Sequence, residues 1–136
     1  MRRGSLRAAY IRLKAERLRA LMRWREFLPA IVKAIEEVLG DRPVYVFGSV
    51  VEGEITADSD VDVAVLVEEV PRSALRRVAL LDRIWSAMER RGVPHWYPVE
   101  LHLMTPEEKA IMERGGARFV DAKRLLSGGG AGGAEA

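Results

Sequence analysis

The first forty residues show the hydrophobic spacing of helices. Apolar side chains recur at steps of three and four residues, which places them on one face of an α-helix: Leu6, Tyr10, Leu13, Leu18, Leu21, Met22, Leu28, Ile31, Val32, Ile35 and Leu39. This pattern predicts a long helical region over residues 1–40. Pro29 lacks a backbone N–H and would clash with the preceding turn, so it predicts a kink or the start of a second helix nearby.

The pattern changes from helix to strand after residue 43. Residues 44–47 form a short run of β-branched and aromatic side chains, and residues 61–67 form a longer one. Between them lies a polar stretch that contains glycine. We therefore expect two strands joined by a functional loop.

The second half of the chain predicts a helix, a third strand and a short helix. Ser73 is a suitable N-cap for a helix that ends near Gly92 and whose spacing predicts these buried residues: Leu75, Val78, Leu81, Ile84, Trp85 and Met88. Residues 99–104 alternate as a strand. Thr105 and Glu108 have capping-box spacing before a helix that reaches Arg114 and is closed by glycines, and residues 119–126 are a last segment.

These elements fit one domain of the α/β (α+β) class. The chain has 136 residues, of which 49% are hydrophobic, enough for a single core. We expect a small mixed sheet with helices packed on one face, over residues 1–127. Residues 1–40 would be the helical region and residues 44–104 the core, and the Gly/Ala-rich residues 128–136 would be a disordered tail.

Composition indicates where the protein is found and which side-chain chemistry it lacks. No apolar run reaches the roughly 20 residues that cross a bilayer, and the N-terminus lacks the apolar stretch of a signal peptide, so we expect a cytoplasmic protein. Cysteine is absent, which excludes disulfides and thiolate sites. Asparagine and glutamine are also absent, which favours a thermophilic source.

The net charge of +2 divides unevenly along the chain. Residues 1–33 carry ten Lys or Arg against Glu16 and Glu26, a balance of +8, which leaves −6 for the remainder. Such a basic arm suits RNA, an acidic partner or a solvated helix face. We interpret it as a solvated face and do not expect direct nucleic-acid binding. The apolar stripe of this region exceeds what one small sheet covers, which predicts a partner protein or a homodimer.

Two aspartates stand at the start of the second predicted strand. Because side chains alternate along a strand, Asp60 and Asp62 point the same way, about 6.6 Å apart, while Val61 and Val63 point into the core. At an effective dielectric near 20, two such charges repel by roughly 2 to 3 kcal/mol, so a bound cation would stabilise them. Oxygen ligands favour Mg²⁺ or Mn²⁺, completed by water and substrate phosphates.

The third predicted strand offers another carboxylate. Glu100, His102 and Met104 share one face, so Glu100 can join the aspartates if this strand lies beside theirs. A third acid there could bind the second of two metals in an in-line displacement. We interpret His102 as a packed or solvated residue, and Trp96 as a packing residue rather than a base-stacking one.

The loop between the first two strands begins with Gly48-Ser49. A glycine after a strand lets backbone N–H groups approach a phosphate, and the serine hydroxyl adds a donor. Gly48-Ser49, ten intervening residues and Asp60-Val61-Asp62 before an apolar strand resemble the minimal nucleotidyltransferase domains of the DNA polymerase beta superfamily. The resemblance implies that Gly48 and Ser49 hold the phosphates of ATP. It also implies that Asp60, Asp62 and Glu100 are the metal-binding catalytic acids.

The same resemblance implies a biological role. Similar proteins pair with a helical HEPN-type RNase toxin and act as antitoxins that transfer AMP from ATP to a tyrosine of that toxin. Two alternatives are a binding module of this fold that neutralises its partner without turnover, and a transferase that acts on a small molecule. The sequence departs from the family at Val50 and Glu52, where arginines are common. Nucleotide binding would therefore need a basic residue from elsewhere, such as Arg42 or an arginine of the N-terminal region.

Overall fold

The computed structural model describes residues 3–128, which form a four-stranded sheet and six helices. In chain order they are α1 (Arg3–Met22), α2 (Trp24–Leu39), β1 (Val44–Phe47), α3 (Ser49–Glu52), β2 (Val61–Leu66), α4 (Ala74–Arg90), β3 (Val99–Met104), α5 (Pro106–Arg114), β4 (Val120–Asp121) and α6 (Ala122–Gly128). Apart from Gly128, which ends α6, the tail predicted to be disordered lies outside the described residues.

The sheet is mixed, as the sequence predicts. Its strand order is β3-β2-β1-β4. Strand β1 pairs antiparallel with both β2 and β4, whereas β2 and β3 run parallel. The parallel pair needs a crossover connection, which α4 supplies. The expected fold class, with its long N-terminal helix, is therefore confirmed.

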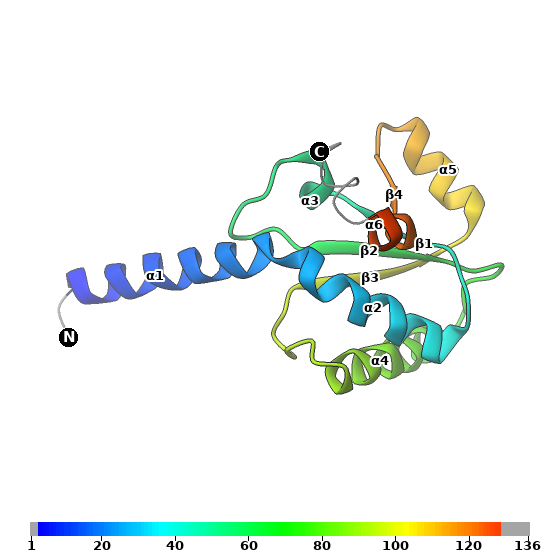
Figure 1. Cartoon of the computed structure of the whole chain (residues 1–136), viewed down its shortest axis with the longest axis horizontal. Coiled ribbons are helices and arrows are strands. Elements are labelled where there is room, and N and C mark those ends of the chain that lie inside the picture. The colour runs from blue at the N-terminus through cyan, green and yellow to red at the C-terminus, as the bar shows by residue number, and fades with distance from the viewer. Residues whose placement is uncertain (1–2, 129–136) are drawn as a thin grey trace.

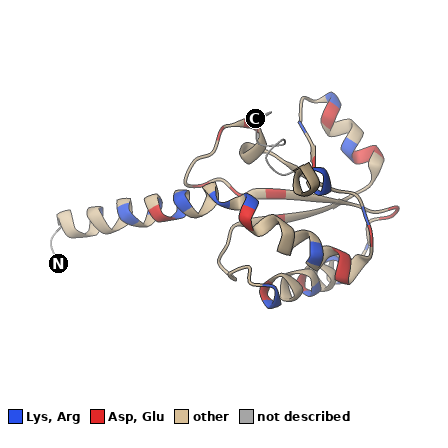
Figure 2. Ribbon diagram, viewed as in Figure 1, with Lys and Arg blue, Asp and Glu red and all other residues tan. Residues whose placement is uncertain are grey.

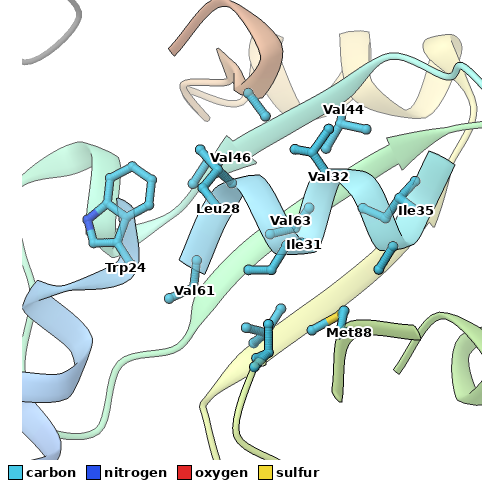
Figure 3. Close-up of a cluster of buried hydrophobic side chains, with 14 of the residues drawn as sticks. Trp24, Leu28, Ile31, Val32, Ile35, Val44, Val46, Val61, Val63 and Met88 are labelled. Atoms are coloured by element: carbon cyan, nitrogen blue, oxygen red, sulfur yellow. The ribbon is translucent and has the colours of Figure 1, made fainter. Parts of the chain in front are cut away.

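Helices α2 and α4 cover one face of this sheet, and the main core lies between them and the strands (Figure 1). Figure 3 shows Leu28, Ile31 and Ile35 of α2 in one buried cluster with Val46 and Val63 of the sheet. Each such aliphatic side chain stabilises the fold by roughly 1.5 to 3 kcal/mol when it is fully buried. This layer holds β1 and β2 in place and so fixes the loop between them.

The opposite face of the sheet is only partly covered. Its apolar positions are Tyr45, Phe47, Ala64, Leu66 and Met104, packed against Phe119. Helix α5 contributes the ammonium group of Lys109, which lies 4.4 Å from the Tyr45 ring centroid and 5.1 Å from that of Phe119. Because strand side chains alternate, Asp62 belongs to this more open face.

The N-terminal helical region breaks earlier than its proline indicates. The two helices separate at Arg23, and Pro29 lies inside α2 without ending it. A proline at such a position costs about 3 kcal/mol. Burial of Leu28, Ile31 and Val32 in the core outweighs this cost, because these side chains together contribute more than the lost hydrogen bond.

Helix α4 confirms its predicted cap and corrects its predicted buried face. The Ser73 hydroxyl accepts a hydrogen bond from the backbone N–H of Arg76, but Leu75 is 83% exposed and Val78 is 55% exposed. Only the second half of the helix, with Ile84 and Met88, reaches the core. In α5, the predicted capping box between Thr105 and Glu108 is present.

Helix α1 extends away from the body of the molecule (Figure 1). Residues 4–13 are all exposed, among them Leu6, Tyr10 and Leu13. Figure 2 shows basic residues along this helix. Ten helical residues with no buried face are marginal in water on their own, so this part of α1 gains little stability from packing within residues 3–128. Among residues 3–128, no helix combines the length and the apolar character needed to span a bilayer.

Tyr97 fastens α1 to the body, and its removal gives a first prediction. Its hydroxyl donates a 2.7 Å hydrogen bond to the Ala20 carbonyl, and its ring is buried against Phe27. Burial raises the pKa of Tyr97 to about 12. Because the folded pKa lies above the ordinary value of 10.0, the unionised phenol stabilises the fold below pH 10. As the pH rises through 10 toward 12, the cost of burying the ionised phenolate lowers the free energy of unfolding.

Tyr97→Phe should lower the free energy of unfolding by about 1 kcal/mol at neutral pH, because one hydrogen bond is lost. It should also make the free energy of unfolding less sensitive to pH above 10. Urea unfolding of both proteins at pH 7 and at pH 11 measures the two effects. An identical alkaline loss of stability in the two proteins would contradict this account of Tyr97.

Candidate active site

Three strands bring the residues of the site to one end of the sheet. Because β1 and β2 are antiparallel, the end of β1 meets the start of β2, with Phe47 opposite Asp62. Because β2 and β3 are parallel, both begin at that end, with Asp62 opposite Glu100. The register therefore places Gly48, Asp62 and Glu100 together, although up to 52 residues separate them in the sequence.

The centre of the site is a cluster of two carboxylates and an imidazole. Asp62, Glu100 and His102 each offer one ligand atom, and these atoms all lie within 4.8 Å of one another. The His102 Nε2 atom is 3.1 Å from Asp62 Oδ1 and 3.3 Å from Glu100 Oε1. An edge-on contact with the Phe47 ring, 5.0 Å between ring centroids, orients the imidazole. These atoms have the chemistry and the spacing to hold one divalent cation.

The cluster attracts positive charge. The nearby Asp62 carboxylate raises the pKa of Glu100, and partial burial raises it further. The hydrogen bond to Asp62 is also the main cause that raises the pKa of His102, while burial opposes it. The negative charge of Asp60 raises the pKa of Glu100 further. Both groups thus hold protons more tightly than usual, which is the behaviour of a site with excess negative charge that a metal ion can neutralise.

Gly48 leaves space for the Asp62 carboxylate. Its backbone has φ +81° and ψ −156°, a conformation that residues with a side chain rarely adopt. A Cβ atom built at this position would collide with Asp62 Oδ2. The next residue, Ser49, is half-buried and begins the short helix α3. The glycine is therefore required both by the backbone of the turn and by the space that the Asp62 carboxylate occupies.

Asp60 lies beside the cluster and contacts an arginine of α1. The Arg17 guanidinium donates from Nη2 to Asp60 Oδ1 at 3.5 Å and to the Ser59 carbonyl at 3.2 Å. Its Nε donates to the Ala57 carbonyl. Lys14, which lies one helical turn before Arg17 on α1, pairs with Asp58. Helix α1 therefore holds the loop that carries Asp60, and only Asp60 Oδ1 is engaged by this arginine.

The structure brings together most of the residues that the sequence singles out. Asp62 and Glu100 both belong to the cluster, and Asp60 lies beside it. The Asp62 carboxylate occupies the space that a side chain at Gly48 would take. The sequence alone favours a packed or solvated His102, but the structure places its imidazole between the two acids. Its position on the Glu100 face of β3 was the sequence signal for this placement.

Arg17 is the other residue that pattern reasoning could not assign to the site. The sequence leaves open whether Arg42 or an N-terminal arginine replaces the missing loop arginines. Arg42 lies at the far end of β1, where it approaches Glu68 at 3.8 Å. Arg17 supplies the cation next to Asp60 instead, and Arg118 donates to the Val51 carbonyl in helix α3. No sequence signal marks either contact, because the partners lie 43 and 67 positions apart in the sequence.

A mixed sheet that gathers acidic residues at one end, beside a glycine turn, fits a protein of the nucleotidyltransferase class. A sequence profile of the family described as nucleotidyltransferase domain matches residues 28–118, which is more than half of the chain. The chain therefore belongs to this family, part of the DNA polymerase beta superfamily.

A solved crystal structure of a protein described as a candidate nucleotidyltransferase is also similar. The similarity covers 65% of this chain and 89% of the other, with 21% identity and a TM-score of 0.43. Comparison with curated proteins gives no match.

Proposed function

We propose that the protein transfers AMP from ATP to a hydroxyl group of a protein, with Mg²⁺ or Mn²⁺ as the cofactor. The observation that carries this proposal is the cluster of Asp62, Glu100 and His102 beside Gly48, within the part of the chain that matches the nucleotidyltransferase family. In this proposal Asp60, Asp62 and Glu100 bind the metal, and Gly48 and Ser49 hold the triphosphate. The metal supplies charge neutralisation at the reacting phosphate.

The donor set fits this cofactor. Two carboxylates and an imidazole nitrogen converge within 4.8 Å, and the absent side chain of Gly48 leaves the Asp62 carboxylate free to turn toward a ligand. Asp60 contributes from the edge of the cluster through the carboxylate oxygen that Arg17 does not engage. Oxygen-rich sites of this kind suit Mg²⁺ and Mn²⁺, which keep open positions for phosphate oxygens.

The reaction is a substitution at the α-phosphorus of ATP. The acceptor hydroxyl oxygen forms a new bond to this phosphorus, and the bond from the phosphorus to the oxygen bridging to the β-phosphate breaks. Pyrophosphate leaves with that bonding electron pair. The hydroxyl proton passes to a carboxylate of the cluster and then to water. The products are an AMP ester of the acceptor and pyrophosphate, so atoms and charge balance.

The partner belongs to the same proposal. A HEPN-type toxin would be the acceptor and the chain its antitoxin. The uncovered apolar residues of α1 support the existence of a protein partner, because they lack a contact surface within residues 3–128. A homodimer through this helix would cover the same residues.

Two other functions are consistent with the fold. A binding module would neutralise its partner by complex formation alone, and a small-molecule transferase would modify a soluble acceptor. The double variant Asp60→Ala, Asp62→Ala separates the first from our proposal. A transferase loses partner neutralisation in this variant, whereas a binding module retains it.

The experiment that tests the proposal uses ATP labelled at either the α- or the γ-phosphate, with Mg²⁺. Three acceptors are offered: a random copolymer of Glu and Tyr, transfer RNA, and an aminoglycoside. We expect the α-label alone to move, and to move onto the copolymer. Transfer to RNA or to the aminoglycoside would contradict the protein acceptor. Failure of the α-label to move to any acceptor would favour the binding module.

Arg17 gives a further prediction for this activity. If its guanidinium positions the loop of Asp60, Arg17→Ala should lower transfer about tenfold, mainly through kcat, because the misplaced carboxylate affects the reacting geometry. Arg17→Lys keeps the positive charge, but an ammonium group cannot make all the hydrogen bonds that the guanidinium makes to the loop. It should therefore restore the activity only in part.

Steady-state kinetics of both variants separate this role from simple charge. Arg12→Ala, which removes a basic residue from the exposed part of α1, is the matched control and should leave kcat unchanged. Full activity in Arg17→Ala would show that the contact with the loop is incidental.

A further inference from the structure

A groove of about 850 Å³ runs along α1, where the helix meets the loop before β3. Its apolar lining comes from Leu13 and Ala20 of α1 and from Trp96 of the loop. Leu13 is 68% exposed and Trp96 is 58% exposed, so both present apolar surface to an occupant. Exposed aromatic and aliphatic side chains beside each other are typical of peptide-binding surfaces.

This groove borders the loop that carries Asp60. Lys14 and Arg17 line it, and the same two side chains contact Asp58 and Asp60. The groove is therefore joined by two ion pairs to the loop that carries Asp60, the residue beside the acidic cluster. A chain lying in the groove would pass within reach of the loop that carries Asp60.

The charge of the groove favours an acidic occupant. Four cationic side chains line it, Lys14, Arg17, Arg19 and Arg23, against the single acid Glu16. The blue positions along α1 in Figure 2 show how these charges follow the helix. The lining therefore carries more basic than acidic groups, which favours an acidic occupant over a basic one.

The pairing of these cations favours a polypeptide over RNA. Lys14, Arg17 and Arg23 already pair with Asp58, Asp60 and Glu26. Within residues 3–128, only Arg19 of the four cations has no ion pair. A nucleic-acid backbone needs a row of cations for successive phosphates. One available arginine beside Leu13 and Trp96 instead matches a segment with one or two carboxylates next to an apolar or aromatic side chain.

We propose that this groove along α1 binds an acidic polypeptide segment of the acceptor and presents a hydroxyl of that segment to the active site. The proposal rests on the proposed nucleotidyltransferase function and adds the recognition chemistry of its acceptor. It also gives a role to the exposed helix, whose Leu13 and Arg19 have no structural contact that requires them.

The test measures binding without ATP. A fluorescein-labelled copolymer of Glu and Tyr is titrated with the protein at physiological salt, and anisotropy reports the complex. A copolymer of Lys and Tyr and a single-stranded oligouridine are the comparison probes. We expect the Glu/Tyr copolymer to bind more tightly than either of them.

Two double variants locate the binding surface. Leu13→Glu with Arg19→Glu should weaken binding of the Glu/Tyr copolymer at least about tenfold, because it removes apolar contact and reverses the available charge. Leu75→Glu with Arg76→Glu makes the same substitutions at exposed positions of α4, away from the groove, and should leave binding within about twofold of the unsubstituted protein.

Equal weakening by both double variants would overturn the proposal, because it would show only general electrostatic attraction. Tighter binding of oligouridine, lost in the α1 variant alone, would show an RNA surface and overturn it as well. The outcome is independent of the proposed reaction. If the copolymer binds at α1 but the protein has no transfer activity, the groove is a binding site for acidic polypeptides and the proposed function is refuted. Transfer to the copolymer that is unchanged by the α1 substitutions would support the proposed function and refute the role of the groove.

Discussion

Asp62→Asn should lower nucleotidyl transfer by about 10³-fold with little change in stability. The amide keeps the shape of the side chain but removes the charge that the proposed metal requires, and losses of this size follow removal of one strong transition-state contact. Asp62 is also the hub of the cluster, since it contacts His102 and raises the pKa of Glu100. Initial rates of α-label transfer at saturating Mg²⁺ measure the effect.

Asp82→Asn is the matched control for this substitution. Asp82 lies exposed on α4 and outside the cluster, so the same chemical change there should leave the rate unaltered. Thermal unfolding of both variants shows whether the fold is intact. A rate for Asp62→Asn within tenfold of the unsubstituted protein would remove this carboxylate from the reaction.

Gly48→Ala should both destabilise the protein and abolish nucleotide binding. The backbone at φ +81° and ψ −156° disfavours any side chain, at a cost of about 1 to 3 kcal/mol. In addition, the new methyl group would collide with the Asp62 carboxylate and displace it from the cluster. Chemical denaturation measures the first effect, and titration with ATP and Mg²⁺ measures the second.

Gly40→Ala separates backbone strain from the collision. Gly40 has nearly the same backbone angles, φ +81° and ψ −165°, but nothing lies within 4 Å of its added Cβ. We therefore expect a similar loss of stability and normal nucleotide binding. Normal ATP binding in folded Gly48→Ala would show that the space beside Asp62 has no functional importance.

The sequence predicts the sheet well because its strands carry strong local signals. Val44–Phe47, Val61–Leu66 and Val99–Met104 are apolar runs of strand length with turn residues around them. The two-residue strand β4 has no such signal, since it forms only by pairing with the edge of β1. The break between α1 and α2 was misplaced because Pro29 is tolerated where the core buries its neighbours.

The carboxylates of the site were predictable, but their surroundings were not. Alternation along β2 and β3 places Asp62 and Glu100 on one face, and only parallel pairing of these strands is needed to bring them together. Arg17 reaches Asp60 because of the angle at which α1 leaves α2, which no local pattern encodes. The same limit applies to the groove, which combines a helix with a loop more than seventy residues away.

The most direct test of the account is calorimetric titration of ATP into the protein, with Mg²⁺ and with excess EDTA. The titration is repeated on the double variant Asp60→Ala, Asp62→Ala. The account predicts binding that requires both the metal and the two carboxylates. Equal binding in EDTA or in the double variant, or no binding at millimolar ATP, would contradict a metal-dependent nucleotide site at this end of the sheet.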